Sequence, residues 1–268
     1  MRPLINCTLA VVLVSVLSAP SNGYIMRREV VRKTPASGFT VFRLKNIAGT
    51  VHVGSYQSDT LSVSAEFRIR APSKSKAEEI FSETGFDFAE FPGRLYLEPD
   101  LPPLRQYGLF AVEGRARTSV AVDYEIMLPA AMNIEIEITD GDIILEKIKS
   151  SYKLSTERGD IEVDRPGRVP GSVKTARGDI TLVAHQCGWD GKFSAECGSG
   201  TINARFLQSA DLVFEAGSLK GDISFLFEAI RPVIRDDNSI MAVFGKGRGR
   251  ISLWSVRGEI TAEPVSSE

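Results

Sequence analysis

The sequence is short of the side chains that bind transition metals and of charge of one sign. Its 268 residues include two histidines and three cysteines, which leaves few ligands for a metal site. The 32 lysines and arginines are balanced by 34 aspartates and glutamates, so the chain lacks the basic field that binding to a nucleic-acid backbone requires. We therefore expect no cofactor and no nucleic-acid partner. The content of 43% hydrophobic and 25% charged residues is that of a folded globular protein.

The chain also lacks an apolar run long enough to span a bilayer, but a shorter run lies near its N-terminus. Residues 9–17 form this run, which follows a single charge at Arg2 and precedes the small residues Ser21 and Gly23. This pattern is typical of a secretory signal peptide, because a membrane-spanning helix needs about 20 apolar residues. We predict a signal peptide over residues 1–23. The mature protein, residues 24–268, is then periplasmic or secreted from a bacterium and has no transmembrane span; an uncleaved anchor is the alternative.

Two cysteines remain in the predicted mature protein. Cys187 and Cys197 are ten positions apart, and an oxidising compartment would allow a disulfide that closes a short loop. Two separate buried thiols are the alternative, because Cys197 also falls on a position that the repeat described next turns inward. The spacing leaves both interpretations open.

A short phrase recurs along the rest of the chain: glycine, a polar residue that is most often aspartate, isoleucine or valine, any residue, and an apolar residue. An early copy begins at Gly49 and stands alone. Six further copies begin at Gly141, Gly159, Gly178, Gly200, Gly221 and Gly258. From Gly141 to Gly221 the successive glycines are 18, 19, 22 and 21 positions apart. Upstream of each glycine the residues alternate between two faces, as they do in a β-strand.

This period predicts an all-β fold, a parallel β-solenoid or β-helix with coils of about 20 residues that bury one continuous core. Glycine is expected at each corner because the backbone there needs a positive φ or a close approach to its neighbour. The structural turn is therefore assigned to the six repeated glycines. We expect successive parallel coils whose isoleucines form one inward stack: Ile143, Ile161, Ile180, Ile202 and Ile223. The alternative is an antiparallel sandwich, which would not require the same phrase in every coil.

Two insertions interrupt this single predicted domain. Residues 73–84 predict one short surface helix that begins at a capping serine, and residues 99–117 predict a long loop, so that helix and loop together occupy residues 73–117. A second loop is predicted over residues 231–247. The first loop contains apolar residues that we expect to cap the open end of the solenoid, although loops on a rigid scaffold also carry binding surfaces. These residues are Leu104, Tyr107, Leu109 and Phe110.

Several of these segments together resemble a known family. They are residues 39–53, the strand that ends with residues 123–129, the glycine-aspartate-isoleucine phrases, and the closing copies at Gly249 and Gly258. Together they resemble the bacterial "putative adhesin" family, a domain of unknown function related to the head-GIN adhesin domains. The resemblance covers roughly residues 39–262. It implies a β-helical envelope or exported protein with no established catalytic residue.

Aspartate follows four of the corner glycines, at Asp142, Asp160, Asp179 and Asp222. Coils stacked in register would arrange these carboxylates in a column with a spacing of about 4.8 Å. Such a column could hold calcium or flank a glycosidic bond. Aspartate beside glycine is also a favoured turn residue, because its side chain bonds the nearby backbone. We predict this structural role, with no catalytic residue, no cofactor site and no metal.

The glycine-rich basic segment at residues 245–250 could hold an anion, but it lacks the spacing of a nucleotide-binding loop. The predicted function is therefore that of a non-catalytic, exported, adhesin-like β-solenoid. It would present a surface to a glycan or to another protein of the cell envelope. The alternative is a carbohydrate-active enzyme, of the glycoside hydrolase or lyase type, that uses the aspartate column.

Overall fold

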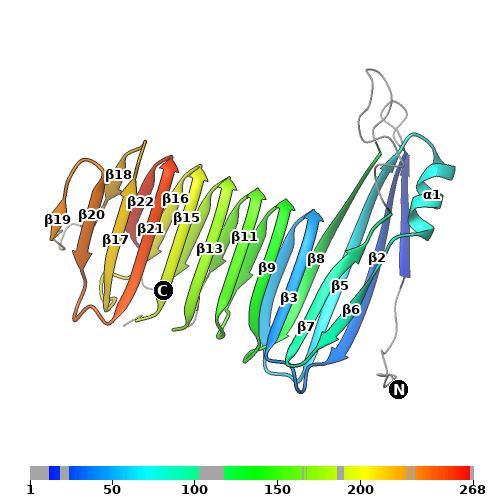
Figure 1. Ribbon diagram of the computed structural model, residues 1–268, viewed down its shortest axis with the longest axis horizontal. Coiled ribbons are helices and arrows are strands. Elements are labelled where there is room, and N and C mark those ends of the chain that lie inside the picture. The colour runs from blue at the N-terminus through cyan, green and yellow to red at the C-terminus, as the bar shows by residue number, and fades with distance from the viewer. Residues whose placement is uncertain are drawn as a thin grey trace.

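Two long β-sheets form the protein. The structure, a computed structural model, describes residues 12–18, 24–102, 118–164, 166, 168–185, 190–227, 230 and 233–265. Within this part of the chain each sheet has eleven strands, and the two sheets lie one behind the other along the length of the molecule (Figure 1). We call the sheet that contains β4 sheet A and the sheet that contains β3 sheet B.

The centre of the molecule is a stack of parallel coils, as predicted. Each coil has a strand in sheet B, a glycine corner and a shorter strand in sheet A, and neighbouring coils pair in parallel with the glycines in register. The first five coils in space are β3–β4 (Val41–Ala48, Val51–Tyr56), β9–β10 (Asn133–Asp140, Ile143–Glu146), β11–β12 (Tyr152–Arg158, Ile161–Asp164), β13–β14 (Pro170–Arg177, Ile180–Ala184) and β15–β16 (Lys192–Ser199, Ile202–Phe206).

The predicted alternation identifies the buried face of these strands correctly. The side chains five positions before each corner glycine are at most 5% exposed: Leu44, Ile136, Leu154, Val173, Ala195, Ala216 and Leu253. Those three positions before it are also buried: Asn46, Ile138, Thr156, Thr175, Cys197, Ser218 and Ser255. The core of the coils is therefore one continuous column between the two sheets.

The order of the last coils differs from the prediction. The final coil in sequence, β21–β22 (Gly249–Arg257, Ile260–Pro264), lies between β15–β16 and the coil β17–β18 (Leu212–Ser218, Ile223–Phe225). Ile260 consequently separates Ile202 from Ile223 in the inward stack, and Ile223 is only partly buried. The expectation of successive coils from Gly141 to Phe225 is therefore wrong at its last step. The position next to β15–β16 is taken by β21–β22, the last coil of the sequence, and the coil β17–β18 lies beyond it.

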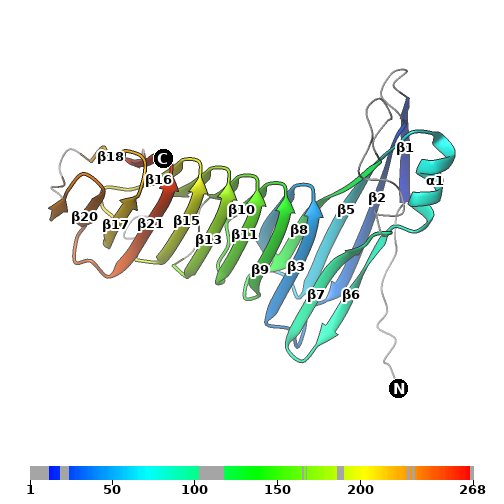
Figure 2. The ribbon, with the colours of Figure 1, turned by 45° about the horizontal axis from the view of Figure 1, so that its top comes forward.

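The second predicted loop contains a hairpin. Strands β19 (Ile234–Arg235) and β20 (Ser239–Val243) pair antiparallel with each other, and β20 pairs antiparallel with β17. The hairpin covers the edge of sheet B beyond the last coil, at the end of the molecule opposite α1 (Figure 2). A loop prediction over residues 231–247 missed it because both strands are short.

The other end of the molecule is antiparallel rather than solenoidal. Sheet A continues through β8 (Ser119–Pro129), β5 (Thr60–Ala71) and β2 (Tyr24–Pro35), which pair antiparallel with one another. Sheet B continues through β7 (Arg94–Asp100) and the antiparallel β6 (Gly85–Phe91). A solenoid over all of residues 24–268 is therefore wrong for this end. Strands β2, β5 and β8 have 12, 12 and 11 residues, which is too long for a coil of about 20 residues that holds two strands.

The predicted surface helix is confirmed as α1 (Lys74–Ser82). The Ser73 hydroxyl accepts the Lys76 N–H at 3.2 Å, which caps the helix, and Ala77 and Ile80 are its buried residues. The predicted loop begins later than residue 99, because β7 extends to Asp100. The apolar residues assigned to that loop, from Leu104 to Phe110, lie outside the described residues.

The segment predicted as a signal peptide includes one more strand. Strand β1 (Val12–Ser18) pairs antiparallel with β2 and forms the edge of sheet A. Among the described residues, no helix is long and apolar enough to cross a membrane. Cleavage after Gly23 stays a prediction.

Candidate functional site

The corner glycines have two steric reasons to be glycine. At Gly159 the backbone has a φ of +140°, and a Cβ atom would lie 2.1 Å from the carbonyl oxygen of Gly141 in the preceding coil. No L side chain fits such an approach. The same arrangement recurs at the other five predicted structural-turn glycines: Gly141, Gly178, Gly200, Gly221 and Gly258.

Hydrogen bonds between coils explain three of the small residues beside the corners. The Thr156 hydroxyl donates to the carbonyl oxygen of Gly141 at 3.0 Å, and the Thr175 hydroxyl donates to that of Gly159 at 3.0 Å. The Cys197 thiol takes the same place and donates to the carbonyl oxygen of Gly178 at 3.3 Å. A carbonyl group buried at the corner needs such a partner. The hydroxyl or thiol column is thus structural.

The Cys197 thiol is buried, and burial raises its pKa. Its predicted partner Cys187 lies outside the described residues. The disulfide between them stays a prediction. The Cys197 thiol donates to the carbonyl oxygen of Gly178, and this contact fits the second interpretation, a thiol packed in the core.

Three of the four predicted aspartates form a ladder that bonds the backbone. Asp142 Oδ1 accepts the N–H of Asp160 at 2.8 Å, and Asp160 Oδ1 accepts the N–H of Asp179 at 2.7 Å. Asp179 Oδ1 accepts the N–H of Thr201 at 2.6 Å. We expected each carboxylate to bond the amides of its own turn. Each of them instead bonds the corner of the following coil, because the coils stack in register.

The fourth aspartate stands apart from this ladder. Two coils, with Thr201 and Glu259 at the equivalent position, separate Asp179 from Asp222. A single column of four carboxylates is therefore wrong, because the coil β15–β16, with Thr201, and the inserted coil β21–β22 lie between Asp179 and Asp222. Over the described residues, no three histidine, cysteine, aspartate or glutamate side chains gather as a metal site would require.

Asp123 makes the same kind of bond to the early coil, apart from the ladder, and was missed in the sequence. Its Oδ1 accepts the N–H of Thr50 at 2.9 Å and a bond from Arg68 Nη2 at 2.8 Å. Asp123 lies within strand β8 and follows no glycine, so the repeated phrase does not include it. Its pairing position against the early coil, one residue before Tyr124, is the same as that of Asp160 before Ile161.

The glycine-rich basic segment holds an anion of the protein itself. Asp211 Oδ1 accepts the N–H of Lys246 at 2.7 Å, and Asp211 Oδ2 lies 2.5 Å from Nε of Arg248. The Arg248 guanidinium, followed by these backbone bonds, lowers the pKa of Asp211. The anion site inferred from residues 245–250 is therefore filled by a side chain.

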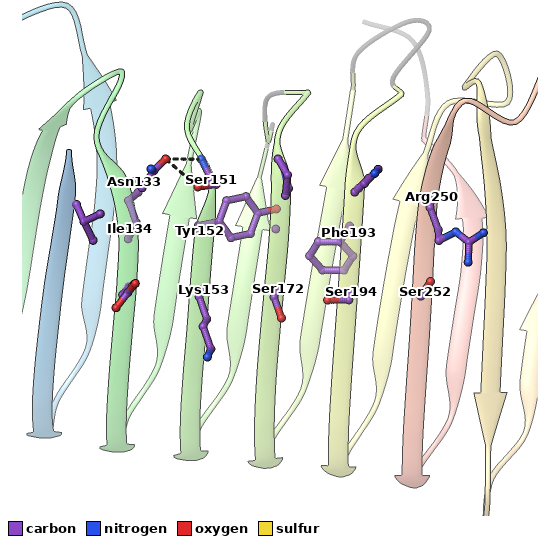
Figure 3. A pocket seen from close by; sticks show the side chains of 15 residues that line it. Asn133, Ile134, Ser151, Tyr152, Lys153, Ser172, Phe193, Ser194, Arg250 and Ser252 are labelled. Atoms are coloured by element: carbon purple, nitrogen blue, oxygen red, sulfur yellow. Dashed lines mark hydrogen bonds between the residues drawn. The ribbon is translucent and has the colours of Figure 1, made fainter.

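The outer face of sheet B carries a trough that crosses the coils. Ser172, Ser194 and Ser252 stand opposite one another on β13, β15 and β21 and point away from the core. Larger residues rise on both sides of them: Pro170, Lys192 and Arg250 toward the strand beginnings, and Lys174, Glu196 and Trp254 toward the corners. We call this groove the serine trough. Its hollow has a volume of about 440 Å³ and extends past Lys153 to Asn133 on β9 (Figure 3).

Trp254 stands at the far end of the serine trough. Its indole lies over Gly217 of β17, where a Cβ atom would be 2.4 Å from the ring. The residue is nonetheless 46% exposed, a large fraction for a tryptophan. A second hollow of about 400 Å³ adjoins the indole and shares Ser194 and Ser252 with the first, so the trough is continuous from Lys153 to Trp254.

Most charges along the trough are paired. Lys174 Nζ lies 2.8 Å from Glu196 Oε2, and Arg250 Nη1 lies 3.2 Å from Glu215 Oε2. Within the described part of the chain, Lys153 and Lys192 have no ion-pair partner. The trough thus has two free ammonium groups and no free acid between its serines.

Sequence reasoning missed the trough because its residues come from separate coils. An alignment of the repeats on their glycines would have identified it, because its residues stand six positions before each glycine. They are Arg43, Glu135, Lys153, Ser172, Ser194, Glu215 and Ser252. The strand pairing places these residues in one row across sheet B, except that Ser252 stands between Ser194 and Glu215.

Comparisons with known proteins concern the family and the fold. The profile of the toastrack family DUF4097 matches residues 118–263, more than half of the chain. None of the curated proteins matches the chain in sequence. A solved structure described as "a putative cell adhesion protein" from Clostridium sporogenes is 14% identical, covers 89% of this chain and 100% of its own, and has a TM-score of 0.47. A "putative adhesin" from Bacteroides fragilis is 9% identical, covers 88% and 97%, and has a TM-score of 0.27.

Proposed function

The chain belongs to the toastrack family DUF4097, and on this premise we propose that it is a non-catalytic, adhesin-like protein of the bacterial envelope. Its β-solenoid would act as a rigid scaffold and present an outer sheet face to a glycan or to another protein. A scaffold of this kind keeps the spacing of surface side chains constant, which suits recognition of an extended ligand.

The observation that carries this proposal is the use of the aspartates. Asp142, Asp160 and Asp179 each give a carboxylate oxygen to a backbone N–H of the next coil. A glycosidase needs two carboxyl groups that face the substrate from opposite sides of the bond. Three acids on one corner, each bound to the backbone, favour a structural role over the enzyme alternative.

The proposal of export rests on the N-terminal pattern of residues 1–23. Removal of this segment would remove β1 and leave β2 as the edge of sheet A. Strand β2 carries Arg27, Arg28, Arg32 and Lys33, and charged residues protect an open edge from pairing with other chains. The intact mass of the exported protein tests this step: a chain that begins at Tyr24 is expected, and a chain that retains Met1 contradicts it.

Binding and product analysis on the same glycans test the proposed function. We expect the purified protein to bind a subset of an envelope glycan array, or an envelope protein, and to leave every bound glycan intact. New reducing ends or unsaturated sugars would contradict the proposal. Asp160→Asn separates the two outcomes, because only an enzyme that uses the ladder would lose cleavage with this variant.

A further inference from the structure

We propose that the serine trough binds a linear acidic glycan. In this complex the indole of Trp254 stacks on one sugar ring, the three serine hydroxyls bond sugar hydroxyls, and Lys153 and Lys192 face carboxylates of the ligand. The inference rests on the proposed function, because it names the contact surface and the class of ligand.

The shape of the trough fits an extended chain. Its floor consists of Ser172, Ser194 and Ser252 on three neighbouring strands, which are about 4.8 Å apart in a sheet. Each hydroxyl both donates and accepts hydrogen bonds, as a sugar hydroxyl does. The floor therefore offers a row of equivalent partners at constant spacing, bounded on both sides by larger side chains.

Trp254 supplies the apolar contact that a sugar ring requires. Its indole rests on Gly217 and is 46% exposed, so a broad apolar surface faces solvent beside Ser252. Tryptophan is enriched at contact surfaces, because its broad apolar ring and its polar N–H can engage a partner together. The C–H face of a pyranose is flat and apolar, while the hydroxyls at its rim reach the serines.

Charge selects an acidic ligand over a neutral one. Glu196 and Glu215 are paired with Lys174 and Arg250, and the Glu135 carboxylate is 3.9 Å from Nε of Arg43. The ammonium groups of Lys153 and Lys192 have no such partner among the described residues, and both line the hollow. Two unpaired cations beside a row of hydroxyls match a sugar chain that carries carboxylates.

An oligogalacturonate is the probe, with the carboxyl-reduced oligomer as its neutral counterpart. The purified protein should bind the acidic oligomer at least about tenfold more tightly than the neutral one. Trp254→Ala and the double variant Lys153→Ser with Lys192→Ser should each weaken binding by about tenfold or more. The double variant should also remove the preference for the acidic oligomer and most of the salt dependence.

The matched control is the double variant Lys33→Ser with Lys220→Ser, which removes the same charge at exposed positions away from the trough. It should bind like the unaltered protein, and the lysine variants should keep their melting temperature because the altered side chains are exposed. Equal binding by the trough variants would overturn the inference and leave the proposed function standing. Preference for the neutral oligomer, or binding to proteins only, would do the same. Cleavage of the oligomer would overturn the proposed function itself.

Discussion

Asp160 and Thr175 illustrate how single residues join one coil to the next. Asp160 accepts the N–H of Asp179, and the Thr175 hydroxyl donates to the carbonyl oxygen of Gly159. A hydrogen bond of this kind contributes about 0.5–1.5 kcal/mol to stability. These side chains therefore stabilise the contact between coils, which is where a solenoid holds much of its folding free energy.

Replacement of Asp160 by alanine should lower the free energy of unfolding by about 0.5–2 kcal/mol, the range for loss of a helix cap with the same kind of bond. Asparagine should cost less, because its carbonyl oxygen still accepts the N–H. Asp222→Ala is the control, since Asp222 lies outside the ladder. Urea unfolding of the three variants measures the effect. The structural role would be refuted if Asp160→Ala kept the stability of the original protein but lost a calcium-dependent shift in melting temperature.

Replacement of Gly178 by alanine should be more severe. The new Cβ would lie 2.0 Å from the carbonyl oxygen of Gly159, at a φ of +141°. Gly38→Ala separates the two causes, because Gly38 has a φ of +93° but no atom within 4 Å of the added Cβ. We expect about 1 kcal/mol for Gly38→Ala and more than about 2 kcal/mol for Gly178→Ala by thermal or urea unfolding. Equal losses would show that the close approach between coils matters little.

Asp211 should make stability depend on pH. Its folded-state pKa lies below the ordinary 3.8, mainly because of Arg248. The stabilisation from this group is therefore complete above about pH 4 and is lost as the pH falls through the lowered pKa. Asp211→Asn should melt at a lower temperature than the unaltered protein at pH 7, and this difference in melting temperature should narrow as the pH falls below the ordinary pKa of 3.8. A gap that stays constant with pH would contradict the ion pair, and Arg248→Gln should reproduce the narrowing.

At the scale of elements, the coil β21–β22 lies between the coils β15–β16 and β17–β18 and joins them; we call this inserted coil the wedge. It pairs with β15 and β17 in sheet B and with β16 and β18 in sheet A. The terminal coil β17–β18 and the hairpin on it are therefore joined to the rest of the solenoid through a segment that follows them in sequence.

A chain that ends after Arg248 should keep the coils up to β13–β14 and lose the order of the last one. Hydrogen exchange should then be fast across residues 212–243 and slow across residues 143–184, because stability in a solenoid passes between neighbours. A chain that ends after Pro264 keeps the wedge and is the control. Persistent protection of residues 212–243 in the shorter chain would contradict the wedge.

At the scale of the whole molecule, local spacing predicted the coils but could not predict their order. The alternation before each glycine is a local pattern, because successive side chains of a strand point to opposite faces. It placed Leu154 and Thr156 correctly in the core. Gly200 and Gly221 are 21 positions apart in the sequence, the separation expected of neighbouring coils. The coil of Gly258 nevertheless lies between their two coils. The length of the repeat gives the number of residues in a coil, but it does not determine which coils become neighbours in space.

The candidate site was predictable only in part for a related reason. The aspartate ladder follows glycine and was visible in the repeated phrase, whereas Asp123 holds the same place from a strand of another type. The serine trough is assembled from three coils, and Trp254 comes beside Ser194 and Ser252 through the inserted coil. The long antiparallel strands at the N-terminal end depend on pairings across distant segments, which no local pattern reports.

The fluorescence of Trp254 tests the central claim, that the outer face of sheet B is the contact surface. The chain has two tryptophans, so Trp189→Phe leaves Trp254 as the sole indole emitter. Titration of this variant with the oligogalacturonate should give a saturable change in emission with a shift to shorter wavelength, because a stacked sugar ring removes water from the exposed indole. Binding detected by calorimetry without any change in this emission would contradict the claim.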